Sequence, residues 1–172
     1  MYTAQDLGHQ DSDDLFQKER KAAIIALKKR DKYFDQACRA YDEGDHVSAK
    51  ALAKQGHEQN DKFHQLNNEA SQRIFTARNA HLPHYVVDLH GLLAQEAIDK
   101  TWERLEQLSS VANQGTTKVT LEIITGAGKH QTGLPILRPI LAEFLETNNF
   151  TFREPHPGRF IINVPKTLHF SK

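Results

Sequence analysis

Two short stretches of the sequence combine a glycine turn with side chains that can move protons or hold a phosphate. The first is Val86-Val87-Asp88-Leu89-His90-Gly91, in which an acid and a histidine follow two β-branched residues. In an extended strand, residues i and i+2 point to the same side, so the spacing predicts that Asp88 and His90 act together at the strand's carboxyl end. In α/β folds that end is where ligands usually bind.

The second stretch is a strand over residues 119–124 that runs into Thr125-Gly126-Ala127-Gly128-Lys129-His130. Gly126 and Gly128 allow backbone N–H groups to approach a phosphate closely, and the helix expected behind them favours an anion at its N-terminus. Lys129 would neutralise charge that develops on the phosphoryl oxygens. The two strand ends together predict a site that holds a phosphate and acts on it.

If the substrate is RNA, cleavage without metal needs a base for the 2′-hydroxyl proton and an acid for the leaving 5′-oxygen. His90 suits either role, because an unperturbed histidine has a pKa near ~6.5. Asp88 could orient His90, raise its pKa or hold the attacking hydroxyl. The predicted catalytic residues are Asp88, His90 and His130. The predicted nucleic-acid-binding residues are Gly91, Thr125, Gly126, Gly128, Lys129 and His130.

Each motif also has a purely structural interpretation. Asp88 can cap the next helix while Gly91 makes the turn, and the glycine loop can be a tight β-to-α connection. Metal binding is a weaker idea, because Asp88, His90, His130 and His156 match no standard zinc spacing. We therefore assign no metal ligands and expect no cofactor.

Composition restricts the class of protein. The chain has 172 residues, of which 38% are hydrophobic and 26% charged, and this describes a folded chain. The formal net charge is zero, so nucleic-acid binding must rest on a local patch. The single cysteine, Cys38, excludes an intramolecular disulfide. No apolar run approaches the roughly 20 residues of a membrane span, and the polar start shows no signal peptide, so we expect a cytoplasmic protein without membrane contact.

The pattern of apolar residues predicts an α+β chain in two parts. Residues 1–80 form a helical extension, with two long helices from about 12 to 79 that make an antiparallel hairpin around Gly44 and Asp45. Residues 81–172 form a β-α-β-α-β-β two-layer sandwich. Its expected elements are strands at 85–89, 118–124, 150–153 and 159–164, and helices at 93–110 and 135–148, with a turn at 155–158.

Residues 85–164 resemble an Smr (small MutS-related) domain. The likeness rests on Asp88-Leu89-His90-Gly91 after one strand, Thr125-Gly126-Ala127-Gly128-Lys129-His130 after the next, and the closing Pro-Gly-x-Phe-Ile-Ile-x-Val strand. The segment before it is similar to a helical domain of unknown function that often precedes Smr domains in eukaryotes. That second likeness rests on Tyr33-Phe34-x-x-Ala37, Ala40-Tyr41-Asp42-x-Gly44-Asp45, and Ala49 to Leu52.

The resemblance implies a fold similar to the C-terminal domain of bacterial translation initiation factor three. It also implies nucleic-acid binding and, in several members, endonuclease activity: some nick DNA, and others cut messenger RNA on stalled or collided ribosomes. Active members usually read Thr-Gly-Arg-Gly in the second motif, where this chain has Ala127, and alanine cannot clamp a phosphate as a guanidinium does.

The function predicted from the sequence is therefore a nucleic-acid-binding Smr-domain protein. It acts as a weak or context-dependent RNA endonuclease in translation or mRNA quality control. RNA is favoured over DNA as the partner, the reaction is metal-independent, and the ribosome is a candidate partner. Two alternatives stay open: a non-catalytic RNA- or DNA-binding module, and an interaction adaptor that works through the helical hairpin. Oligomeric state is not predicted.

Overall fold

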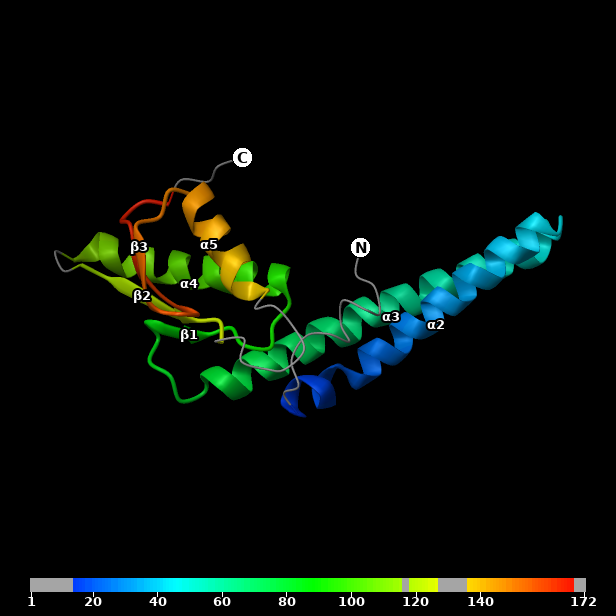
Figure 1. The fold of residues 1–172 in the computed structure, drawn as a ribbon, viewed down its shortest axis with the longest axis horizontal. Coiled ribbons are helices and arrows are strands. Elements are labelled where there is room, and N and C mark those ends of the chain that lie inside the picture. The colour runs from blue at the N-terminus through cyan, green and yellow to red at the C-terminus, as the bar shows by residue number, and fades with distance from the viewer. Residues whose placement is uncertain (1–13, 116–117, 127–135, 169–172) are drawn as a thin grey trace. The chain divides into compact units, whose positions relative to one another are not determined.

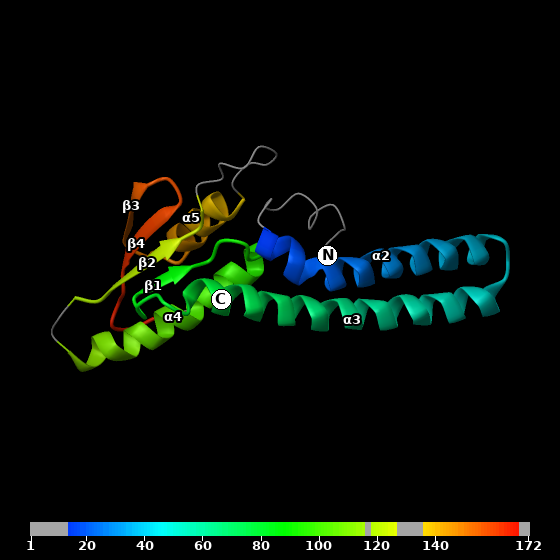
Figure 2. The ribbon, with the colours of Figure 1, turned by 90° about the horizontal axis from the view of Figure 1, so that it is seen from below.

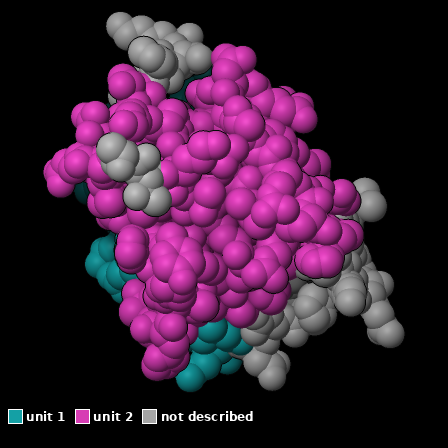
Figure 3. All heavy atoms as spheres, turned by 90° about the vertical axis from the view of Figure 1, so that its left-hand side faces the viewer, with its two compact units in different colours: residues 1–74 teal, residues 75–172 magenta. Residues whose placement is uncertain are grey.

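The fold was taken from a computed structural model, which describes residues 14–115, 118–126 and 136–168 (Figure 1). The chain divides into two compact units, residues 1–74 and residues 75–172. The described atoms of the second unit form a continuous surface in Figure 3. Within the described residues, none of the helices has the length and apolar character that a membrane crossing requires.

Two long helices make up the first unit, as predicted. Helix α2 covers Asp14–Asp42 and helix α3 begins at His46 and ends at Asn79, so its last turn belongs to the second unit. Gly44 has φ +82°, a conformation that L side chains rarely adopt, and it ends α2. Asp45 starts α3: its Oδ1 accepts a 3.0 Å hydrogen bond from the Ser48 amide, which lowers the pKa of the Asp45 carboxyl.

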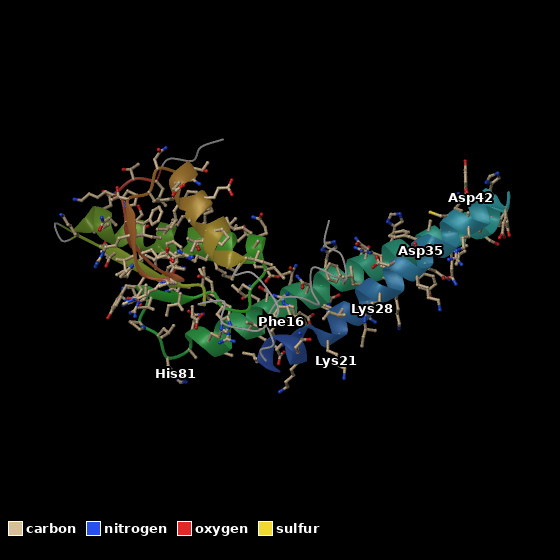
Figure 4. All side chains as sticks on the ribbon, in the orientation of Figure 1. Phe16, Lys21, Lys28, Asp35, Asp42 and His81 are labelled. Carbon is tan, nitrogen blue, oxygen red and sulfur yellow. The ribbon has the colours of Figure 1, made fainter. Side chains whose placement is uncertain are left out.

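Side chains that contact across the hairpin show that α2 and α3 run antiparallel. Near the start of α2, the buried Arg20 donates from Nη1 to Oδ1 of Asn67, and its guanidinium lies over the ring of Phe16. Further along, Gly56 gives room to Phe34, because a Cβ at position 56 would lie 2.5 Å from that ring. The outer side of α2 is polar, with Lys21 and Lys28 exposed (Figure 4).

The second unit has the predicted β-α-β-α-β-β order. Its strands are β1 (Val86–Asp88), β2 (Thr120–Ile124), β3 (Phe152–His156) and β4 (Arg159–Asn163), and its helices are α4 (Ala94–Gln114) and α5 (Leu137–Thr147). The sheet order is β1-β2-β4-β3, with β1 parallel to β2 and the other two pairs antiparallel. The predicted α+β fold class is confirmed.

The two faces of this sheet differ in burial. One face carries the fully buried core side chains of the strands, which are Val87, Leu121, Ile123, Phe160 and Ile162. Helices α4 and α5 pack against each other on this side (Figure 2), where Trp102 of α4 makes edge contacts with Phe144 of α5 and with Phe150. We call the opposite side, which carries Asp88, Ile124 and Arg159, the open face of the sheet.

Some boundaries differ from the sequence prediction. Strand β1 stops at Asp88 instead of continuing to Leu89, although the Leu89 amide still donates to the Ile124 carbonyl. Strand β3 extends through Pro155 to His156, which the sequence assigned to a turn. Proline is tolerated there because β3 is an edge strand with an irregular register between Arg153 and His156.

Candidate active site

The structure brings the two sequence motifs together at the carboxyl ends of two neighbouring parallel strands. The imidazole of His90 lies against Gly126: a Cβ at position 126 would be 3.1 Å from Cδ2 of the histidine ring. Gly126 has φ +82°, so both its backbone conformation and its closeness to His90 favour glycine. A phosphate bound at Gly126 would therefore lie beside the His90 imidazole, a group that can accept or donate a proton.

Asp88 acts on His90 through the main chain. Its Oδ1 accepts a 2.9 Å hydrogen bond from the His90 amide, which closes a turn just after β1. Because β1 ends at Asp88, the alternation of a strand does not govern where the His90 ring points. The turn and the contact with Gly126 position it instead. Gly91, buried and with φ +82°, lets the chain leave this turn toward α4.

The turn between β3 and β4 supports the segment that follows β2. The Gly158 carbonyl accepts hydrogen bonds from the Thr125 amide at 2.8 Å and from the Thr125 hydroxyl at 3.2 Å. A Cβ at position 158 would lie 2.3 Å from the carbonyl oxygen of Gly126. Thr125 is buried, so its hydroxyl fixes the loop against the β3–β4 turn in this structure.

Glu154 holds the β3–β4 turn in place. Its Oε1 accepts hydrogen bonds of 2.7 Å from the Gly158 amide and from Nε of Arg138, and its Oε2 accepts one from Nη2 of Arg138 at 3.0 Å. Arg138 lies in the first turn of α5. The ion pair with Arg138, together with the Gly158 amide, lowers the pKa of the Glu154 carboxyl. The same ion pair raises the pKa of Arg138.

The lowered pKa of Glu154 predicts a pH dependence of stability. A carboxyl whose pKa falls on folding stabilises the native state above its ordinary value of 4.5, and this contribution is lost as pH falls through the folded-state pKa. We expect Glu154→Gln to be less stable than wild type near neutral pH. The difference in the free energy of unfolding should shrink as the pH falls below 4.5 and through the folded-state pKa of Glu154. Urea unfolding followed by Trp102 fluorescence, from about pH 7 to about pH 3, measures it. A difference that stays constant across this range would contradict the prediction.

Asn79, the last residue of α3, completes the outer edge of β1. Its Nδ2 donates to the carbonyl of Asp88, the Asp88 amide donates back to its Oδ1, and both distances are 2.8 Å. Nδ2 also donates to the carbonyl of Phe75 at 2.8 Å. Because β1 is an edge strand, these side-chain bonds take the place of a neighbouring strand. Asn79 therefore fixes the backbone of the residue that carries the candidate carboxylate.

Replacing Asn79 should weaken this edge. Asn79→Leu keeps the branched shape of the side chain but leaves the Asp88 amide and carbonyl without these partners, at an expected cost of about 1–3 kcal/mol in the free energy of unfolding. The matched control is Asn68→Leu, at an exposed position of the same helix. The urea midpoint reported by Trp102 is the measurement. Equal midpoints for the two variants would show that the Asn79 bonds contribute nothing.

Three predicted site residues, Gly128, Lys129 and His130, lie outside the described residues, as does Ala127. Across the described ranges, no group of three or more His, Cys, Asp or Glu side chains is arranged to hold a metal ion. Of the ligands considered from sequence, His156 lies on the edge strand β3 and Asp88 on the edge strand at the other side of the sheet.

The residues that support the two motifs could not be identified from sequence patterns. Asn79 gave no signal, because an asparagine at a helix end is ordinary. Pro157-Gly158 was expected to form a turn, but nothing indicated that the turn lies against Thr125. Glu122 did carry a signal: a carboxylate inside an otherwise apolar strand needs a partner, and it pairs with Arg159 at 2.5 Å.

The chain is similar to known proteins over most of its length. Residues 16–79 match the family model described as a domain of unknown function, DUF1771. The chain is 34% identical to the human NEDD4-binding protein 2 over 81% of its length, and 28% identical to the fission yeast (Schizosaccharomyces pombe) Smr domain-containing protein C11H11.03c over 87%. It is also 30% identical over 77% of its length to a Saccharomyces cerevisiae protein named Endonuclease NBR9.

The matched regions are unequal parts of these relatives. They cover 8% of NEDD4-binding protein 2, 71% of the fission yeast protein and 54% of NBR9. The DUF1771 match ends at Asn79, and the motifs at Asp88 and Gly126 follow it within the similar region. The chain belongs to the Smr-domain proteins in which a helical DUF1771 region precedes the Smr domain.

Proposed function

We propose that this protein binds RNA and cleaves it weakly, or only in a particular context, at the site formed by Asp88, His90 and the loop after β2. The contact between the His90 ring and Gly126 carries the proposal, because it joins a proton-transfer group to a loop suited to phosphate. The similarity to a yeast protein named as an endonuclease supports it. The expected setting is mRNA quality control in the cytoplasm, with the ribosome presenting the substrate.

The reaction we propose needs no group beyond the RNA and the protein. One acid–base residue takes the proton of the 2′-hydroxyl, the 2′-oxygen attacks the phosphorus, and the bond from phosphorus to the 5′-oxygen breaks. A second residue gives a proton to the leaving 5′-oxygen, which leaves a cyclic 2′,3′-phosphate and a 5′-hydroxyl. His90 takes one of these roles and His130 the other, and Asp88 keeps His90 in place through its amide.

The test is a cleavage assay on end-labelled single-stranded RNA, with and without EDTA. The control substrate carries one 2′-deoxy nucleotide at the mapped cleavage position. We expect the all-ribose RNA to be cleaved equally well with and without EDTA. The control substrate should not be cleaved at its 2′-deoxy nucleotide. Loss of activity in EDTA, or cutting at the deoxy position, would contradict attack by the 2′-hydroxyl. Binding without cleavage, also when translating ribosomes are added, would favour the non-catalytic module. A protein that binds no nucleic acid would favour an adaptor that works through the helical hairpin.

A further inference from the structure

Four side chains form a row across the open face of the sheet, beginning at the candidate active site. The strand register pairs Asp88 with Ile124, Ile124 with Arg159, and Arg159 with His156. Register partners project on the same side of a sheet. With neighbouring strands about 4.8 Å apart, the row from Asp88 to His156 spans roughly 14 Å. The row crosses all four strands at the end of the sheet where β1 and β2 reach their carboxyl ends.

The far part of this row is basic and accessible. The side chain of Arg159 is 49% exposed, and His156 is exposed beside it on the edge strand. Arg159 donates from Nη2 to Oε1 of Glu122 at 2.5 Å. A guanidinium has five N–H donors in a planar fork, so this ion pair leaves donors free for a phosphate. The His156 imidazole adds a further hydrogen-bonding group beside the guanidinium.

The contact between turn and loop ties the basic pair to the reacting centre. Arg159 directly follows Gly158, whose carbonyl holds Thr125 and whose Cα lies against Gly126. Gly126 in turn lies against His90. These two contacts with Gly126 set the distance between the His90 ring and the start of β4. A site that binds successive phosphates of one RNA strand requires such a defined distance.

We propose that single-stranded RNA crosses the open face along this row, with phosphates next to the cleaved one bound by Arg159 and His156. The inference rests on the proposed function, since it takes Asp88 and His90 as the point of cleavage. Glu122 weakens RNA binding, because its carboxylate competes with phosphate for the Arg159 guanidinium and repels the negatively charged RNA. Removing Arg159 and removing Glu122 must therefore change RNA affinity in opposite directions.

The experiment measures binding of a fluorescein-labelled single-stranded RNA by anisotropy, at several salt concentrations, for the full chain. We expect Arg159→Gln to weaken binding about tenfold and to reduce the slope of log K against log salt by about 0.7, the value for one lost phosphate contact on a single strand. His156→Gln should have a smaller effect in the same direction. Glu122→Gln should strengthen binding several-fold.

The matched control is Lys118→Gln, which removes one positive charge from an exposed position just before the other end of β2. It should change affinity by less than about twofold, because a single charge far from the row is screened. If Arg159→Gln and His156→Gln behave like Lys118→Gln, or if Glu122→Gln weakens binding, the route across the open face is wrong.

A second measurement separates this inference from the proposed function. At saturating protein, single-turnover cleavage by Arg159→Gln should remain within about threefold of wild type, because Arg159 holds a phosphate that does not react. A large fall in that rate with unchanged affinity would place Arg159 at the reacting phosphate and overturn the assignment. If wild type binds and cleaves RNA but the row variants change nothing, only the route fails. If wild type neither binds nor cleaves RNA, both proposals fail.

Discussion

Replacing His90 with alanine should lower the rate of RNA cleavage by about 10²- to 10⁴-fold, the usual contribution of a positioned acid–base group. The imidazole is the part of the site that touches the loop after β2, so its removal deletes proton transfer at the point where a phosphate would be held. The His90 amide stays available to Asp88, so the turn after β1 remains supported. The single-turnover rate on labelled RNA measures the effect.

The matched control for this variant is His84→Ala. His84 is an exposed histidine before β1, and its ring contacts the ring of Tyr85. The His84→Ala variant should cleave RNA at the wild-type rate. Anisotropy should show that His90→Ala binds RNA within a few-fold of wild type, because the other predicted phosphate contacts remain. Cleavage by His90→Ala at the wild-type rate would remove His90 from the mechanism.

Replacing Gly158 with alanine should strongly destabilise the second unit. Gly158 has φ +79°, which costs an L residue about 1–2 kcal/mol. In addition, the new Cβ would stand 2.3 Å from the Gly126 carbonyl oxygen and 3.2 Å from the Thr125 hydroxyl, so the backbone must move. We expect a total cost of about 2–5 kcal/mol in the free energy of unfolding, measured by Trp102 fluorescence in urea.

Gly44→Ala separates the contact from the backbone conformation. Gly44 has nearly the same φ, +82°, but no atom lies within 4 Å of a Cβ built there. This variant should cost only the conformational part, about 1–2 kcal/mol, measured by the helical circular dichroism of the hairpin. An equal cost for the two variants would mean that the approach of Gly158 to Gly126 is not tight in solution.

Gly158→Ala should also slow RNA cleavage under conditions where this variant remains folded. Moving the β3–β4 turn displaces Thr125 and Gly126, and a shift of about 1 Å in a catalytic arrangement can cost roughly 10²-fold in rate. We therefore expect slow cleavage at a temperature well below the unfolding midpoint. Wild-type cleavage by the folded variant would show that the β3–β4 turn does not position the loop.

Much of the fold could be predicted because its signals are local. Helix α2 ends where Gly44 takes a positive φ and α3 starts where Asp45 caps it, and both residues carry these preferences themselves. The strands were recognisable from β-branched runs, yet their ends were less certain. Pro155 indicated a turn but lies in β3, because an edge strand tolerates the missing amide donor.

Burial at the tip of the hairpin does not follow from the helical period alone. Tyr41 lies four residues after the buried Ala37, on the same side of α2, but it is 63% exposed near the end of the helix, where its ring makes an edge contact with His46. The helical period identifies a face, but it does not say how far along that face the partner helix fills the contact. Packing at the tip depends on the particular side chains that meet there.

Sequence patterns predict the order of the elements, the fold class and the two candidate motifs, because periodicity, glycine turns and caps act over a few neighbouring residues. Three contacts were visible only in the folded chain: His90 lies against Gly126, Gly158 accepts hydrogen bonds from Thr125, and Asn79 completes the edge of β1. These contacts join residues far apart in the chain. They follow from strand register and backbone approach, which no local preference specifies.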